Sequence, residues 1–357
     1  MPERTYTVAV IAGDGIGPEL VESALTVLDA VTSTTPFALR TVAVDGGAGT
    51  YQREGAALSD AGLAAVRSAD ATLKGPVGLP HVRMPDGTEA GLLGGILRNG
   101  LDLYANVRPV TLLPGVESRL RVEPGAIDYV IVRENTEGLY ASRGKGVGNE
   151  RAMADTLLVT RAGCERIVRH AFDLALRRSG APADGVRRVT CVDKANVLRS
   201  MYFFRSVFLE VAEEYPGVEA ECRYVDAMAQ ALVMEPEHFD VVVTESMFGD
   251  ILSDLGGGTV GGVALCPGGN IGDARAYFEP IHGSAPTLAG QDRANPLSQI
   301  LAAAMMLDHL GEPAAGDLIR GSVRTALASG AIRLRRDGTA EGGTRAVTDA
   351  VVGALGS

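Results

Sequence analysis

Short apolar runs alternate with longer amphipathic stretches along the whole chain. The run from Phe239 to Thr244 is rich in β-branched residues, as a strand buried on both faces should be. Residues 6–11 and 188–192 also read as strands, and residues 161–178 carry the apolar stripe of a helix. This alternation predicts an α/β protein, and 357 residues are enough for two such domains.

The same pattern predicts the remaining elements. Strands are expected near residues 69–74 and 220–225, and helices at 18–31, 202–214, 226–233 and 297–310. The glycine-dense segments 256–262 and 266–272 are interpreted as loops, and the proline- and glycine-rich segment 81–95 as a loop that could contact a substrate.

The sequence Gly13-Asp-Gly-Ile-Gly17 follows the first strand, and Pro18 is well placed to begin a helix. Its spacing differs from the dinucleotide fingerprint G-x-G-x-x-G, and Asp45 opens a glycine loop where the fingerprint needs an acid ending a second strand. We therefore interpret it as a tight strand-to-helix turn, with a phosphate cradle as the alternative.

The charge balance restricts the class of partner. With 33 basic and 44 acidic residues, the net charge of −11 argues against a nucleic-acid or membrane-surface protein. The four cysteines form no C-x-x-C motif, the N-terminus lacks a signal pattern, and no apolar run approaches the roughly 20 residues of a membrane span. We expect a cytoplasmic protein whose partners are small molecules or copies of itself.

Three acids are candidates for a metal site. Asp250 and Asp254 lie one helical turn apart just beyond the apolar run at 239–244, where α/β sheets place their ligands. Hard oxygen ligands at this spacing suit Mg²⁺ or Mn²⁺, whereas an exposed acidic helix face is the alternative. Asp226 also follows a strand, and it could be either a helix N-cap or a third acid.

Four basic residues complete the candidate chemistry. Arg98, Arg108 and Arg133 each lie near the end of an apolar stretch, where they could be surface ion-pair residues or a clamp for a di- or tricarboxylate. Lys194 follows a buried strand, and it could be either a desolvated base or a solvated lysine in a turn.

Several long motifs occur in an order that resembles one family: the metal-dependent decarboxylating β-hydroxyacid dehydrogenases, which include isocitrate, homoisocitrate, 3-isopropylmalate and tartrate/D-malate dehydrogenases. The motifs are GDGIG at 13–17, LDLYANVRP at 101–109, VIVRENTEGLY at 130–140, the Lys194-Ala-Asn turn, FGDILSDLGG at 248–257, GNIGD at 269–273 and FEPIHGSAP at 278–286.

This resemblance implies an isopropylmalate/isocitrate dehydrogenase-like fold of two α/β domains, distinct from the Rossmann fold. Residues 1–100 plus 255–357 would form a discontinuous cofactor-binding domain, and residues 101–254 a central domain that dimerises. The implied reaction is the oxidative decarboxylation of a 3-substituted (2R)-malate to a 2-oxo acid and CO₂. It would use Mg²⁺ or Mn²⁺ and NAD⁺, in a homodimer or tetramer with shared active sites.

The resemblance also assigns roles to residues. Asp250 and Asp254 would bind the metal from one subunit and Asp226 from the other. Lys194 would take the proton of the C2 hydroxyl, and Tyr140 would protonate the enol after CO₂ leaves. The malate carboxylates would be bound by Arg98, Arg108 and Arg133. Cofactor contacts would come from Lys74 and from the loop residues His282, Gly283, Ser284, Ala285, Pro286 and Asn295.

The chain departs from the family pattern in two places. Thr287-Leu288 stands where NAD-using members have an acid and NADP-using isocitrate enzymes have Lys-Tyr. We expect NAD⁺, although Arg293 nearby leaves NADP⁺ open. Leu92 and Leu93 resemble the apolar wall of isopropylmalate enzymes, but a Gly94-Gly95 pair lengthens the spacing to Arg98.

The substrate therefore stays open among 3-isopropylmalate, homoisocitrate, isocitrate, a tartrate/D-malate type and a substituted malate of secondary metabolism. A non-catalytic regulatory subunit of an oligomeric dehydrogenase is the alternative of another class. The presence of Lys194, Tyr140 and all three aspartates argues against that alternative.

Overall fold

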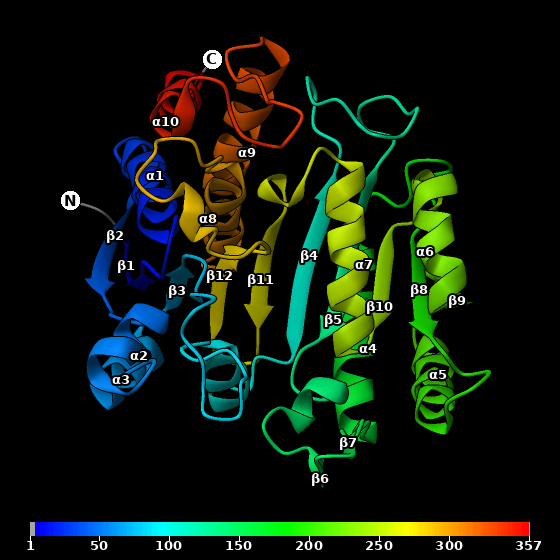
Figure 1. Cartoon of the computed structure of the whole chain (residues 1–357). Coiled ribbons are helices and arrows are strands. Elements are labelled where there is room, and N and C mark those ends of the chain that lie inside the picture. Colours follow the sequence, from blue (N-terminus) through cyan, green and yellow to red (C-terminus); the bar gives the residue numbers. More distant parts are fainter. Residues whose placement is uncertain (1–3, 357) are drawn as a thin grey trace. The chain divides into compact units, whose positions relative to one another are not determined.

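The computed structural model describes residues 4–356 and divides into two compact units. Unit 1 runs up to Leu101, includes the short segment Leu113–Glu117 and resumes from Gly261 onward. Unit 2 comprises Asp102–Leu112 and Ser118–Val260. Both units combine helices with strands (Figure 1), so the α/β class expected from the sequence is confirmed.

Unit 1 is built on five strands in the order β2-β1-β3-β12-β11, of which only β11 and β12 pair antiparallel. The strands are β1 (Arg4–Ile11), β2 (Phe37–Ala43), β3 (Ala71–Lys74), β11 (Pro267–Ile271) and β12 (Ala276–Pro280). The helices are α1 (Gly17–Thr32), α2 (Ala48–Glu54), α3 (Asp60–Ser68), α8 (Leu297–His309), α9 (Pro313–Ala328) and α10 (Gly343–Gly353). Short helical turns lie at Gly95–Asn99, Val263–Leu265 and Pro286–Leu288.

Unit 2 has five strands in the order β4-β5-β10-β8-β9, of which only β4 and β5 pair antiparallel. The strands are β4 (Ala105–Thr111), β5 (Asp128–Glu134), β8 (Arg188–Asp193), β9 (Glu219–Tyr224) and β10 (Val241–Thr244), and a separate hairpin joins β6 (Val147–Asn149) to β7 (Ala152–Ala154). The helices are α4 (Arg161–Arg177), α5 (Arg199–Ala212), α6 (Val225–Met234) and α7 (Ser246–Thr259). Short turns lie at Leu139–Ser142 and Pro236–His238.

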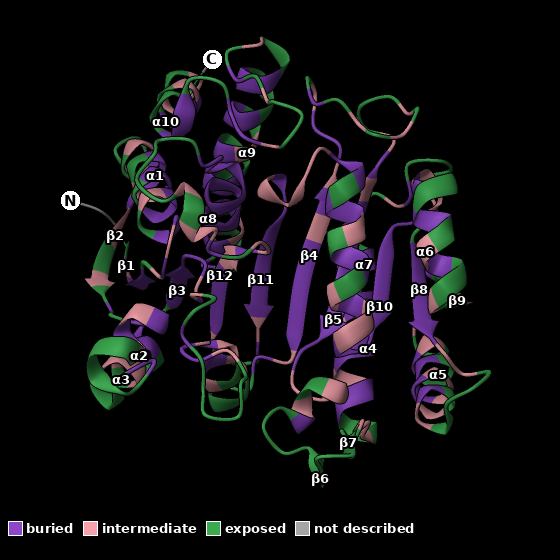
Figure 2. Cartoon of the chain, in the orientation of Figure 1, coloured by how far each residue is buried: buried purple, intermediate pink, exposed green. Residues whose placement is uncertain are grey.

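The parallel strands of unit 2 bring the candidate residues to one edge. Each residue of β10 is buried, as its β-branched sequence predicts, and the central strands are correspondingly purple in Figure 2. Because β5, β10, β8 and β9 run parallel, their carboxyl ends meet at the same edge of the sheet. Arg133, Lys194 and Asp226 therefore all lie at or just beyond this edge.

The prediction that two glycine-dense segments are loops was wrong for most of their length, although residues 260–262 do lie outside helix and strand. Gly256, Gly257 and Gly258 lie within α7, and residues 267–271 form β11. Close packing explains the glycines. A Cβ added at Gly256 would lie 2.5 Å from the Tyr129 hydroxyl oxygen, and one at Gly269 would lie 3.0 Å from Cε1 of Phe278. These glycines let the backbone approach its neighbours, and they do not interrupt the elements.

The turn at Gly13–Gly17 is held by its own hydrogen bonds. The Asp14 carboxylate accepts hydrogen bonds from the backbone N–H groups of Ala48, Gly49 and Gly78 at 2.7–2.8 Å. The N–H of Ile16 donates to the Ser284 carbonyl at 2.8 Å, and the N–H of Gly17 donates to the Asp14 carbonyl. Since the N–H groups of Ile16 and Gly17 at the start of α1 are already hydrogen-bonded, the tight-turn interpretation is supported over a phosphate cradle.

None of the helices within residues 4–356 is long and apolar enough to cross a membrane.

His170 on α4 makes the stability of the chain depend on pH. Burial, and then the charge of Arg177, lower the pKa of His170 to about 4. The unfolded chain, with an imidazole pKa near 6.5, binds more protons below that value. The contribution of the neutral His170 side chain to stability is therefore fully present above about pH 6.5 and is lost as the pH falls toward 4.

We expect a loss of about 2 kcal/mol from His170 between pH 7 and pH 4.5, after allowance for the partly exposed ring. The measurement is urea unfolding of the wild type and of His170→Gln at both pH values. The glutamine variant should lose less stability than the wild type by about that amount. Equal losses would show that His170 does not carry this dependence.

Candidate active site

The helix α7 fixes the two candidate metal acids. Glu245 caps its first turn by accepting a hydrogen bond from the Phe248 N–H at 2.7 Å, which orients the start of the helix. Asp250 and Asp254 then follow four residues apart on one face. Their side chains are 37% and 62% exposed, so both carboxylates reach solvent and can accept a ligand.

Two buried guanidinium groups meet at Asp250. Its Oδ1 accepts hydrogen bonds from Arg133 Nη1 at 2.5 Å and from Arg108 Nη1 at 3.1 Å. The side chains of Arg133 and Arg108 are only 1% and 5% exposed. Asn106 and Ser253 also accept hydrogen bonds from Arg108, at 2.6 and 2.7 Å. The alternative that these two arginines are surface ion-pair residues was therefore wrong.

Tyr140 joins the same carboxylate from the turn Leu139–Ser142. Its hydroxyl donates to Asp250 Oδ2 at 3.1 Å, and its ring lies with its centroid 5.4 Å from Cζ of Arg133. Burial first, and then the negative charge of Asp250, raise the pKa of Tyr140. Asp250 therefore gathers two cations and one proton donor around its two oxygen atoms.

Lys194 and Asp226 form a second group in unit 2. Lys194 Nζ makes an ion pair with Asp226 Oδ1, and the two side chains are 27% and 67% exposed. Asp226 lies in the first turn of α6, and the N-cap is Tyr224, so the N-cap interpretation of Asp226 was wrong. The alternative that Lys194 is a freely solvated turn lysine is likewise not supported.

A single chain brings together only part of the expected metal site. No group of three or more His, Cys, Asp or Glu side chains that could hold a metal ion occurs within residues 4–356. Asp250 and Asp254 share a face of α7. Asp226 lies on α6 and forms an ion pair with Lys194. The expectation that Asp226 joins these two acids from a partner subunit stays a prediction.

In unit 1, two predicted ligand-binding cations contact one acid. Lys74 Nζ lies 2.5 Å from Glu279 Oε2, and Arg98 Nη2 lies 3.4 Å from Glu279 Oε1. Arg98 also donates through Nε to the Tyr277 hydroxyl at 3.1 Å. Arg98 belongs to the π-helical turn Gly95–Asn99, which the glycine pair Gly94-Gly95 opens.

The two leucines of the proposed specificity segment differ in burial. Leu93 is fully buried, and a Cβ added at Gly46 would lie 3.1 Å from Cδ1 of Leu93, so Leu93 packs inside unit 1. Leu92 is half-buried. Of the two, only Leu92 has surface left for a substrate.

The predicted cofactor loop is anchored at several points. The buried Ser284 donates its hydroxyl proton to the Gly78 carbonyl, and Asn295 donates through Nδ2 to the Gly338 carbonyl at 3.2 Å. Ala285 adopts a left-handed φ of 36° just before Pro286. His282 and Gly283 lie in the same loop. Burial lowers the pKa of His282. Leu288 packs against the cluster of Ile16, Leu20 and Ala294.

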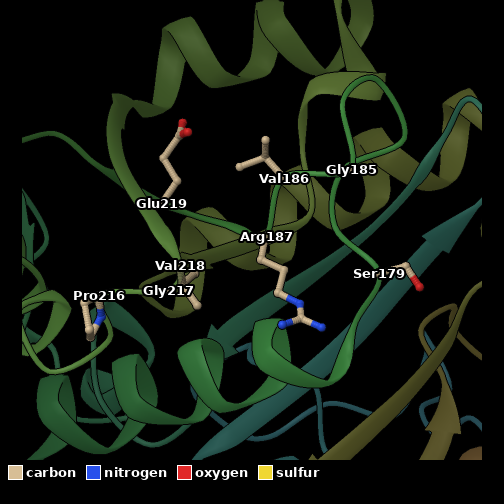
Figure 3. A pocket seen from close by; sticks show the side chains of 8 residues that line it. All are labelled: Ser179, Gly185, Val186, Arg187, Pro216, Gly217, Val218 and Glu219. Carbon is tan, nitrogen blue, oxygen red and sulfur yellow. The ribbon is translucent and has the colours of Figure 1, made fainter.

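A surface depression in unit 2 lies away from these residues. Its volume is about 610 Å³, and Figure 3 shows Arg187, Val218 and Glu219 among the side chains that line it. These residues lie at or just before the amino ends of β8 and β9, the opposite edge from Lys194 and Asp226. The depression contains none of the candidate catalytic residues.

The sequence reasoning missed three residues that orient the candidates. Glu245 caps α7, Asp193 precedes Lys194 and is fully buried, and Arg205 binds Asp193 through two hydrogen bonds. Of these three, only Asp193 could have been found from the sequence, because an acid at the end of a wholly buried strand needs a partner.

Comparison with known proteins identifies the class of this enzyme. The chain belongs to the isocitrate/isopropylmalate dehydrogenase family of decarboxylating hydroxyacid dehydrogenases, whose sequence model matches residues 7–351. The resemblance found in the sequence motifs is therefore confirmed.

Individual relatives cover nearly the whole chain. A 3-isopropylmalate/3-methylmalate dehydrogenase of Methanocaldococcus jannaschii is 44% identical over 91% of this chain and 92% of its own length. A 3-isopropylmalate dehydrogenase of Corynebacterium glutamicum is 42% identical over 98% of this chain and 99% of its own.

Among solved structures, an isocitrate dehydrogenase from Methylococcus capsulatus matches with a TM-score of 0.86, 38% identity, 99% of this chain and all of its own. A β-decarboxylating dehydrogenase from Thermococcus kodakarensis in its apo form matches with a TM-score of 0.79 and 38% identity, over 98% and 96% of the two chains. These matches confirm the expected fold.

Proposed function

We propose that the chain catalyses the oxidative decarboxylation of a (2R)-malate carrying an alkyl group at C3, of the 3-isopropylmalate type, with a divalent cation and NAD⁺. The observation that carries this proposal is the meeting of Arg108, Arg133 and Tyr140 at Asp250 on α7. Relatives that are 42–44% identical bear the name 3-isopropylmalate dehydrogenase, and the half-buried Leu92 supports an apolar substituent.

The residues of α7 fit a divalent metal. Asp250 and Asp254 offer hard oxygen donors from one helix face, the donor type that Mg²⁺ and Mn²⁺ prefer. Both are partly exposed, which leaves positions for substrate oxygens and for Asp226 of the partner subunit. When bound there, the cation would supply a Lewis acid that polarises the C2 oxygen of the substrate.

The chain's own residues account for binding and for both proton transfers. The guanidinium groups of Arg108 and Arg133 hold substrate carboxylates, and their burial keeps them in place. Lys194 removes the proton from the C2 hydroxyl. A bound NAD⁺ would supply the acceptor for the C2 hydride. The β-carboxylate then leaves as CO₂, and Tyr140 delivers a proton to C3.

The cofactor contacts are proposed to come from unit 1. Lys74 and the anchored loop of residues 282–295 would bind the dinucleotide. Arg98 would contact the substrate after exchanging part of its bonding to Glu279. NAD⁺ is proposed over NADP⁺ because Thr287 and Leu288 present no charged group for a 2′-phosphate, and Leu288 is packed inward.

A homodimer is proposed because unit 2 exposes many large apolar side chains. On the hairpin β6–β7, Val147 and Met153 are each 69% exposed, and on α6 and α7 Met234 and Ile251 are 72% and 59% exposed. Exposed apolar residues in such number mark an association surface. A dimer through unit 2 would also deliver Lys194 and Asp226 to the acids of the partner.

The test is a panel of (2R)-malates with isopropyl, methyl, carboxymethyl, carboxyethyl and hydroxyl groups at C3, assayed with NAD⁺ and NADP⁺ in the presence of Mg²⁺ or Mn²⁺. We expect reduced dinucleotide and CO₂ in equal amounts, most rapidly from an alkyl-substituted member with NAD⁺, and no turnover after chelation of the metal. Failure of every member with both dinucleotides and both metals would overturn the proposal in favour of a non-catalytic subunit.

A further inference from the structure

The turn that carries Lys194 is fixed by a buried ion pair. Asp193 is fully buried, and its two carboxylate oxygens accept hydrogen bonds from Arg205 Nε at 2.7 Å and Arg205 Nη2 at 2.8 Å. Asp193 Oδ1 also accepts a hydrogen bond from the Ala195 N–H at 2.8 Å. The backbone on both sides of Lys194 is therefore held, but its long side chain is not held by these bonds.

The ring of Tyr224 lies close both to Arg205 of this ion pair and to the lysine ammonium. Tyr224 is the last residue of β9 and pairs in register with Asp193 of β8. The centroid of its ring lies 4.9 Å from Arg205 Cζ and 5.9 Å from Lys194 Nζ. Both distances fall within the range in which a cation is attracted to an aromatic ring. One ring thus contacts both the Arg205 guanidinium group and the Lys194 ammonium group.

The ring of Tyr224 can contact Lys194 while Asp226, the other partner of Lys194, binds a metal. Asp226 pairs with the ammonium, but its carboxylate is also the proposed third ligand of the cation, so the two demands compete. The ring of Tyr224 cannot serve as a metal ligand and remains available to Lys194. A lysine side chain loses considerable rotamer freedom when it is held in one position, so a second contact is useful.

We propose that Tyr224, held by the buried Asp193–Arg205 ion pair, is a positioning residue that sets where the Lys194 ammonium lies. This inference rests on the proposed role of Lys194 as the base for the C2 hydroxyl. Tyr224 touches neither substrate nor cofactor and acts through Lys194. The aromatic ring, and not its hydroxyl group, is the part that matters.

The test compares Tyr224→Leu, which removes the ring, with Tyr224→Phe, which keeps it. Tyr224 is 36% exposed, so both variants should fold, and Tyr224→Met replaces the leucine variant if that one unfolds. We expect kcat for oxidation to fall about 10- to 100-fold in Tyr224→Leu at unchanged KM, because a small misplacement of a catalytic group has effects of this size. In Tyr224→Phe, kcat should stay within about threefold of the wild type.

Decarboxylation of the oxidised substrate, the 3-substituted 2-oxo acid supplied directly, separates the inference from a general defect. This half-reaction needs Tyr140 but not Lys194, so Tyr224→Leu should retain it. Equal loss of oxidation and decarboxylation, or a phenylalanine variant as impaired as the leucine variant, would overturn the inference. A wild type that performs neither half-reaction would instead show that the proposed function itself is wrong.

A second readout needs neither metal nor dinucleotide. Acylation of Lys194 by an N-hydroxysuccinimide ester, followed by peptide mass spectrometry, measures how freely the amine is presented. We expect severalfold faster acylation of Lys194 in Tyr224→Leu than in Tyr224→Phe, with Lys145 as the internal control. Equal rates in the two variants would count against the ring as a contact of Lys194.

Discussion

Replacing Lys194 with methionine should reduce oxidation of the hydroxy acid by about 10³-fold or more, because a positioned general base supplies rate factors of this order. The protein should still fold, since the Lys194–Asp226 ion pair is partly exposed and such pairs contribute little to stability. Steady-state assays with the best member of the malate panel measure the loss. Near-normal turnover by Lys194→Met would remove Lys194 from the mechanism.

Two variants control this experiment. Lys194→Arg keeps the positive charge but cannot release a proton near neutral pH, so it should be almost as inactive as Lys194→Met. Lys145→Met alters an exposed lysine of unit 2 outside the candidate site, and it should behave as the wild type. An active arginine variant would show that only the charge matters.

Mixing of inactive variants then tests whether the lysine acts across the dimer. Lys194→Met supplies an intact Asp250, and Asp250→Asn supplies an intact Lys194. If the two groups come from different subunits, an equal mixture after subunit exchange should regain about one quarter of wild-type activity, because half the dimers carry one intact site of two. No recovery would place both groups in the same subunit.

Asp250→Asn should have the second largest effect, through two physical causes. One of the two carboxylates on α7 becomes neutral, so calorimetry should show Mg²⁺ affinity falling at least about tenfold. Arg133, which is 1% exposed, also loses the negative charge that its Nη1 contacts at 2.5 Å. We expect the free energy of unfolding to fall by about 1–2 kcal/mol, less than for a fully buried pair because Asp250 is partly exposed.

Asp254→Asn is the matched control for Asp250→Asn. Asp254 lies 4.0 Å from Arg108 Nη1 and is 62% exposed, so its charge does little for the buried guanidinium groups. It should weaken Mg²⁺ binding to a similar extent without the loss of stability. If both variants are equally destabilised, Asp250 has no special role in holding Arg133.

The local apolar patterns predicted secondary structure because they mark the residues that each element buries. The run before α7 is β-branched and wholly buried in β10, and the apolar stripe at 161–178 became α4 at Arg161–Arg177. The motifs also placed Asp250, Asp254, Tyr140 and Lys194 near strand ends, and the structure puts Tyr140 in contact with Asp250.

What the sequence could not reveal depends on partners far along the chain. Arg133 looked like a surface residue, because the acid that neutralises it lies 117 positions away. The glycines of 256–262 looked like a loop, because the side chain that crowds Gly256 is Tyr129 on β5. Asp226 stayed open between a cap and a third acid, because its partner Lys194 is 32 positions away. Each of these questions concerns a contact that only the tertiary fold creates.

The glycines of α7 limit how this enzyme could acquire another activity. A Cβ at Gly249 would lie 2.6 Å from Arg133 Cγ, and one at Gly256 would lie 2.5 Å from the Tyr129 hydroxyl oxygen. At these two positions the helix that carries the two acids leaves no room for a side chain, so a substitution at either glycine would displace it. New substrate ranges should consequently arise in the loop segment 81–95 of unit 1, while the acid-bearing helix stays as it is.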